Sequence, residues 1–217
     1  MTCSRRIALT AVLIAVGAAA RIGIGSITMF IPQPLYGLFI AVGLTETLTF
    51  ISGFTLGPAE GFVTGVSIIV ISDIATIPGA WTPVIAVIIG MIGVFAGITR
   101  RLIKQLDFRI MAVSSILLTL MSETLQNVSI ALLFNTPVVA TMISGLPTLI
   151  VALVNNFILF TTVGLRVITM ILGSASNGNK SAAKSEVGAG SEVFARSSSE
   201  RFRGSNSRLL GPLLSRL

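Results

Sequence analysis

Residues 83–98 form the apolar stretch PVIAVIIGMIGVFAGI, and the basic residues Arg100 and Arg101 follow it almost directly. A helix of about 20 apolar residues crosses the hydrocarbon core of a bilayer, and lysine or arginine commonly flanks it on the cytoplasmic side. The whole chain has the same character, since 53% of its residues are hydrophobic, 11% are charged and the mean hydropathy is +0.95. Soluble domains carry about 25% charged residues. The sequence therefore predicts an all-α integral membrane protein.

Clusters of proline and glycine, or charged residues, divide the chain into six apolar segments. The segment that begins at Pro58 is the shortest, but its inclusion places every connecting loop on a consistent side of the membrane. We expect a bundle of six transmembrane helices, formed by residues 7–23, 35–51, 58–71, 83–98, 110–134 and 145–172. This six-helix membrane domain would occupy residues 1–172.

The basic residues fall mainly on one side of the predicted bundle. Loops on the other side, residues 26–34, 72–82 and 135–144, contain no lysine or arginine. Cytoplasmic loops are enriched in these residues, so we expect both termini to be cytoplasmic and the chain to be a multi-pass protein of the cell membrane. The basic residues that set this orientation are Arg5, Arg6, Arg100, Arg101, Lys104, Arg109, Arg166 and those of the C-terminal tail.

Arg21 is the exception, because it lies near the outer end of the first predicted span. Two interpretations stay open for it: the side chain reaches out to the membrane interface, or it faces an interior cavity. The formal net charge of +7 is otherwise explained by topology, and we expect no nucleic-acid partner.

Residues 173–217 form a basic tail rich in serine and glycine. Such a composition offers few apolar side chains to bury, so we expect a disordered cytoplasmic tail. Its last ten residues alternate leucine with arginine, which leaves open either a solvated tail or a weak contact with the anionic leaflet.

Several kinds of chemistry are excluded by composition. The chain has no histidine, and its single cysteine, Cys3, cannot form an intramolecular disulfide or a multi-cysteine metal site. No nucleophile, base and orienting residue can be assembled, so we expect neither an enzyme nor a cofactor or metal. The sequence also lacks the glycine-rich loop that cradles nucleotide phosphates, so any ATP must be used by another subunit.

Small residues recur at helical spacing in the first span, where Ala11, Ala15 and Ala19 form a smooth stripe. Such a stripe serves either packing within the chain or docking to a separate membrane subunit. Glycines four residues apart from Gly53 to Gly65, and the pair Gly93 and Gly97, predict close packing of helices.

Polar side chains inside apolar spans are costly, by about 2.5–3.5 kcal/mol for a charge at the membrane centre, and often mark function. They cluster toward the outer side, which predicts an outward-facing pocket for a small polar organic molecule. The alternative is that the asparagines join helices by hydrogen bonds and that the tryptophan is an interfacial anchor. Glu46 and Glu60 are expected nearer the cytoplasm, in packing or subunit contacts. The predicted substrate-binding residues are Asp73, Trp81, Glu123, Gln126, Asn127, Asn155 and Asn156.

The run GFTLGPAEGF at residues 53–62, continuing through Gly65 to Ser72 and Asp73, resembles the second-to-third helix junction of S components of energy-coupling factor (ECF) vitamin transporters. Other similar features are the basic start before an alanine-striped first helix, the proline-rich run at residues 78–83, and residues 147–160. The resemblance extends over residues 5–172 and leaves the tail outside.

The resemblance implies that the chain binds a substrate and catalyses no reaction. An S component binds a vitamin or related micronutrient from outside, associates with a transmembrane T component and two cytoplasmic ATPases, and topples in the membrane to release its substrate. The family's A-x-x-x-A docking motif for the T component would correspond to Ala11 and Ala15, and one turn further to Ala19. The family's pocket would fall on Trp81, Glu123, Asn127, Asn155 and Asn156. A metal-ion substrate is not expected, since members that carry cobalt or nickel use histidine.

Two other classes stay open on the sequence. One is a structural or assembly subunit of a membrane complex, in which Glu123 and the asparagines only hold helices together. The other is a stand-alone proton-coupled carrier that uses Glu123 as its proton site.

Overall fold

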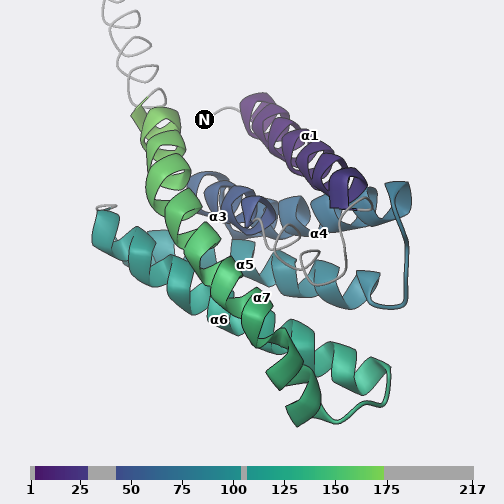
Figure 1. The fold of residues 1–217 in the computed structure, drawn as a ribbon. Coiled ribbons are helices and arrows are strands. Elements are labelled where there is room, and N and C mark those ends of the chain that lie inside the picture. Colours follow the sequence, from purple (N-terminus) through teal and green to yellow (C-terminus); the bar gives the residue numbers. More distant parts are fainter. Residues whose placement is uncertain (1–2, 29–42, 104–106, 174–217) are drawn as a thin grey trace, which may run out of the picture. The chain divides into compact units, whose positions relative to one another are not determined.

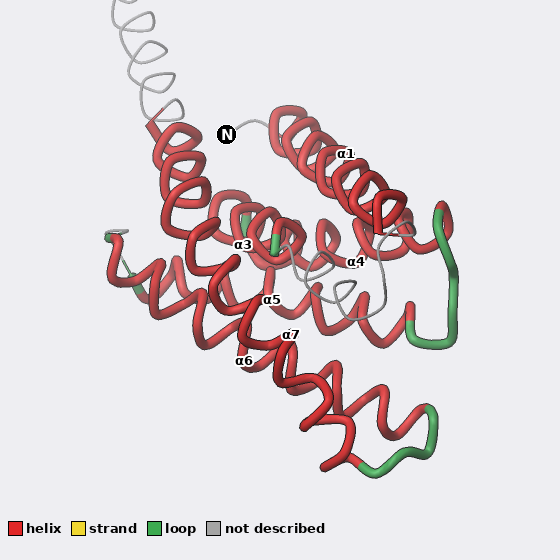
Figure 2. Tube along the Cα trace, in the orientation of Figure 1, coloured by secondary structure: helices red, strands yellow, loops and turns green. Residues whose placement is uncertain are grey.

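The structure is a computed structural model that describes residues 3–28, 43–103 and 107–173, and within these residues every regular element is a helix (Figures 1 and 2). The predicted all-α class is therefore confirmed. The elements, in order, are α1 (Cys3–Thr28), α3 (Leu44–Leu56), α4 (Pro58–Ala75), α5 (Thr82–Leu102), α6 (Phe108–Leu133), α7 (Val138–Leu159) and the π-helical turn η1 (Phe160–Gly164).

The chain separates into two compact units, Met1–Ile171 and Leu172–Leu217. Only the first two residues of the second unit are described. The predictions for the C-terminal tail, for Lys104 and for residues 35–42 of the second span lie outside the described residues.

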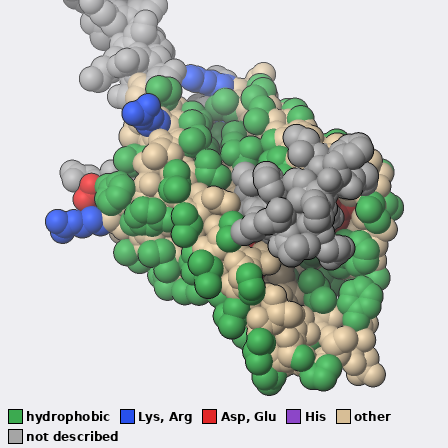
Figure 3. All heavy atoms as spheres, viewed as in Figure 1, with side chains coloured by type: hydrophobic (Ala, Val, Ile, Leu, Met, Phe, Trp, Pro, Cys, Tyr) green, Lys and Arg blue, Asp and Glu red, His purple; other side chains and the backbone are tan. Residues whose placement is uncertain are grey.

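Five helices of the described ranges are long and apolar enough to cross a membrane: α1, α4, α5, α6 and the continuous helix Val138–Gly173 that contains α7 and η1. Hydrophobic side chains cover most of the face in Figure 3, and lysine and arginine lie along its upper and left margins. Helix α3, with 13 residues, is about 20 Å long and shorter than the roughly 30 Å hydrocarbon core. The coarse prediction of a membrane protein thus agrees with the structure, with five of the six expected spans present in the described part.

The last long helix begins earlier than the sequence predicted. Helix α7 starts at Val138, so most of the predicted loop 135–144 is helical, and the connection from α6 is a short turn in which Asn135 has φ 52°. Pro147, two residues after the predicted start of the span, lies inside α7. A proline there forfeits one backbone hydrogen bond, which membrane helices tolerate because neighbouring groups compensate.

Helices α3, α4 and α5 touch through their backbones. A Cβ atom added to Gly61 would lie 2.5 Å from the Cα of Gly53 on α3 and 2.7 Å from the carbonyl oxygen of Gly93 on α5. Further along, a Cβ on Gly65 would lie 2.9 Å from the Cα of Gly90. The close glycine packing predicted from the sequence is confirmed, and only glycine fits at this three-helix contact.

The turn between α3 and α4 depends on Gly57, whose φ of 134° lies in a region that L side chains rarely adopt. Pro58 then opens α4 at the position where its missing N–H is not needed. Two arginines donate hydrogen bonds to the last carbonyl groups of α3, which have no partner within the helix. Arg6 donates to Leu56 O at 2.7 Å. Arg100 donates to Phe54 O at 2.9 Å and to Thr55 O. Cations are favoured at this negative end of a helix.

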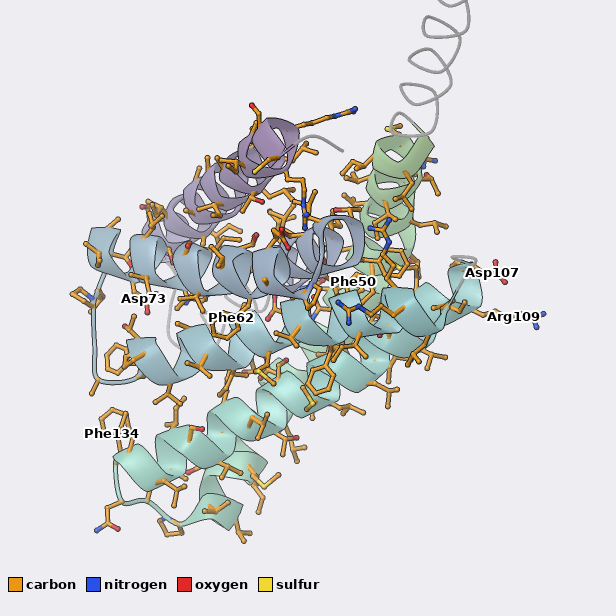
Figure 4. The ribbon with its side chains drawn as sticks, turned by 180° about the vertical axis from the view of Figure 1, so that it is seen from behind. Phe50, Phe62, Asp73, Asp107, Arg109 and Phe134 are labelled. Atoms are coloured by element: carbon orange, nitrogen blue, oxygen red, sulfur yellow. The ribbon has the colours of Figure 1, made fainter. Side chains whose placement is uncertain are left out.

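Helix α1 runs parallel to α4 and is joined to it near both ends. Arg6 pairs with Glu60 at one end, and Arg21 lies 3.3 Å from Asp73 at the other. Helices α6 and α7 form an antiparallel hairpin that packs on α3 and α5, and Phe50 of α3 contacts Phe160 of η1 with ring centroids 5.0 Å apart. Phe50 lies between the helices in Figure 4.

Candidate functional site

The site is built around Asn156 of α7, which is 1% exposed and donates a hydrogen bond from Nδ2 to Thr119 Oγ1 of α6 at 2.8 Å. Its other amide atom, Oδ1, is buried and accepts no hydrogen bond from the described residues. The amide lies against Gly43, directly before α3, so closely that a Cβ on Gly43 would overlap Oδ1. A buried acceptor left unpaired costs about 1–3 kcal/mol, so this oxygen would gain from a hydrogen-bond donor.

Two carboxylates lie near this amide along the helices that surround it. Glu123 follows Thr119 by one turn on α6, and Glu46 stands in the first turn of α3, three residues after Gly43. The charges of Glu46 and Glu123 act on each other, and Glu46 also interacts with Arg21 of α1. Helices α1, α3 and α6 therefore contribute one ionisable side chain each, Arg21, Glu46 and Glu123, to one region of the bundle.

The sequence predicted packing or subunit contacts near the cytoplasmic side for Glu46; in the structure it stands in the first turn of α3, near enough to Glu123 of α6 for the two side chains to interact electrostatically. Helix α3 continues to Leu56, beyond the predicted end of the span at residue 51, so Glu46 lies almost three turns from the turn at Gly57. A sequence signal existed, since Glu46 is the only charged residue between Arg21 and Glu60. Its partner across the bundle could not be identified without the packing of the helices.

Asp73, predicted to bind substrate, already has a partner on each carboxylate oxygen. Arg21 lies 3.3 Å from Oδ1, and Thr82 of α5 donates to Oδ2 at 2.8 Å. Asp73 is 4% exposed and joins α1, α4 and α5 at the end of α4 seen in Figure 4. The Arg21 side chain, which is 33% exposed, is therefore held beside Asp73 in an ion pair.

Asn127 lies against α7, where a Cβ on Gly145 would be 2.7 Å from its Nδ2 atom. This contact agrees with the interhelical alternative for Asn127. Gln126 and Asn155 are half-buried. The predicted face of Glu123, Gln126 and Asn127 therefore does not act as one unit: Glu123 belongs to the cluster with Glu46, and Asn127 to the α6–α7 contact.

Trp81 is half-buried before α5, and its ring lies 6.3 Å from that of Phe134 at the end of α6, tilted by 41°. Gly79 lies under the indole, since a Cβ there would overlap the ring. Trp81 therefore connects the α4–α5 loop to the end of α6.

The alanine stripe faces outward. Ala11, Ala15 and Ala19 are all exposed, whereas Leu13 and Ala18 on another side of α1 are buried. Of the two interpretations of the stripe, packing within the chain does not agree with this exposure.

The cluster of Glu46, Glu123 and Asn156 offers two carboxyl groups and the unpaired amide oxygen of Asn156 as hydrogen-bond acceptors. No group of three or more acidic or cysteine side chains in the described ranges is arranged to hold a metal ion. Carboxylates and an amide oxygen instead suit an organic ligand that carries hydrogen-bond donors or positive charge.

Searches against protein-family models, curated proteins and solved structures gave no match to this chain.

Proposed function

We propose that this chain is the membrane-embedded substrate-capture subunit of an ATP-driven uptake transporter of the ECF type, for a vitamin or related small organic micronutrient. The observation that carries the proposal is the cluster of Glu46, Glu123 and Asn156 among long apolar helices. Ionisable groups in such helices are rare and mark ligand or ion pathways.

The outward alanine stripe supports the same proposal. A capture subunit needs a surface on which a transmembrane partner can pack closely, and small residues on an exposed helix face provide one. Helix α1 offers Ala11, Ala15 and Ala19 in that arrangement. The partners would be a transmembrane T component and two cytoplasmic ATPases, since the chain has no nucleotide-binding loop of its own.

The test is mass spectrometry of small molecules released from the purified protein in detergent, for the natural chain and two variants. Glu123→Gln replaces the carboxyl group with an amide of nearly the same size and shape. Thr124→Ala changes the exposed neighbouring position and is the control. We expect one compound at a near one-to-one ratio in the natural chain and in the control, and its loss in Glu123→Gln.

Repeated absence of a bound compound from folded protein, against a panel of vitamins, would contradict the proposal and favour a structural subunit. If the chain alone moved substrate into vesicles without any ATPase, the result would contradict the proposal and favour a stand-alone carrier.

A further inference from the structure

A groove of about 640 Å³ runs between α1 and α4 on the surface of the bundle. Its walls are mainly apolar, and half-exposed or exposed residues such as Ile7 and Val63 line it. At one end the groove reaches Cys3, Arg6 and Glu60. Its long walls belong to two helices that are apolar enough to span a membrane, so the groove opens to the region of lipid chains.

A second, basic pocket of about 520 Å³ adjoins that end of the groove, at the turn between α3 and α4. Arg6, Ala59 and Glu60 line both spaces, so the groove and the pocket adjoin at the Arg6–Glu60 ion pair. Arg100 and Arg101 from the end of α5 complete the pocket.

The charge of this pocket is positive. Arg6 is paired with Glu60 and Arg100 binds carbonyls of α3, but Arg101 is exposed and makes no hydrogen bond or ion pair with the described residues. Three arginines against one glutamate leave two positive charges.

We propose that the basic pocket and the α1–α4 groove together bind one anionic phospholipid. The phosphate would lie beside Arg101 and Arg100, and an acyl chain would follow the groove past Ile7 and Val63. A soluble anion would explain the pocket but not the apolar groove that continues from it. Basic side chains beside apolar helices attract anionic lipid, by about 1 kcal/mol for each arginine near the surface. The lipid proposal does not rest on the transport function, although Ala11 of the alanine stripe also lines the groove.

The test is native mass spectrometry of the full chain in detergent, titrated with phosphatidylglycerol or phosphatidylcholine. Arg101→Gln removes the free charge, and Arg109→Gln removes an equal charge from the start of α6, which projects away from the bundle in Figure 4. We expect preferential binding of phosphatidylglycerol, weakened about fivefold by Arg101→Gln and unchanged by Arg109→Gln. Equal binding of the two lipids, or equal effects of the two variants, would overturn the proposal.

Cys3 gives a second measurement, because it lines the groove and is the only cysteine of the chain. Phosphatidylglycerol should slow labelling of Cys3 by a maleimide, and inorganic phosphate should not. Val63→Trp, at an exposed position, fills the groove and should weaken lipid binding without unfolding the protein. Protection by phosphate alone, or full lipid binding in Val63→Trp, would show that the groove holds no acyl chain.

Discussion

The Arg21 guanidinium of α1 lies 3.3 Å from Oδ1 of the Asp73 carboxylate of α4, and the Thr82 hydroxyl donates a hydrogen bond to Oδ2 of the same carboxylate. The Asp73 side chain is 6% exposed, so its charge depends on these partners. Removing one partner of a buried ion pair leaves an uncompensated charge, which typically costs 3–5 kcal/mol, whereas removing both charges is often close to neutral.

We therefore expect Arg21→Met to destabilise the protein by about 3 kcal/mol and the double variant Arg21→Met, Asp73→Asn to recover more than about 1 kcal/mol of that loss. Thermal unfolding in detergent measures both, with exposed Arg109→Met as the control. Strictly additive effects of the two substitutions would argue against a coupled pair.

The glycine contact of α3, α4 and α5 makes a second prediction. Gly61→Ala places a methyl group 2.5 Å from a backbone atom of α3, and overpacking of this kind costs roughly 1–3 kcal/mol. The melting temperature should fall clearly. Gly23→Ala on α1 is the matched control, because its added Cβ meets nothing within 4 Å and should keep or raise stability. Equal melting temperatures for the two variants would contradict the backbone contact.

The amide of Asn156 and the backbone of Gly43 occupy adjoining space, so one substitution should rescue another. Gly43→Ala forces a methyl group into the Asn156 side chain and should abolish or greatly reduce folded protein. Asn156→Ala removes all three atoms that a Cβ on Gly43 would meet, and the double variant should fold better than Gly43→Ala alone. Size-exclusion yield in detergent is the readout, and lack of rescue would show that Gly43 is needed for another reason.

The exposed alanine stripe predicts a loss of assembly without a loss of folding. Ala15→Leu enlarges the outward face of α1, so it should leave the melting temperature and ligand retention unchanged but weaken association with a T component. Val16→Leu, beside it and also exposed, is the control. Co-purification of the complex measures the effect. If the Ala15→Leu variant still assembled normally, the alanine stripe would not be part of the docking surface.

The all-helical fold and the close glycine contacts were predictable because apolar length and small-residue spacing are local properties of the sequence. The start of α7 was not, since Pro147 usually ends or begins a helix and only the surrounding bundle permits it inside one. The site was partly predictable: Glu123 and Asn156 stand out as polar residues in apolar segments. Their separation from Asn127 depends on helix rotation, which the sequence does not specify.

The π-helical turn η1 keeps one side of the last helix facing the bundle. Ala152, Asn156, Phe160, Gly164 and Ile168 recur every four residues and all are buried. In a regular α-helix, a side chain four residues further along points about 40° further around the helix axis. Over four such steps the side chains of this row would therefore turn from the interior toward lipid. The wider turn, closed by an i→i+5 bond from Leu165 to Phe160, offsets part of that rotation. Deleting one residue within η1 would restore α-helical winding and turn the Ile168 side chain away from the interior. The number of residues in this turn therefore determines which side chains later in the helix face inward.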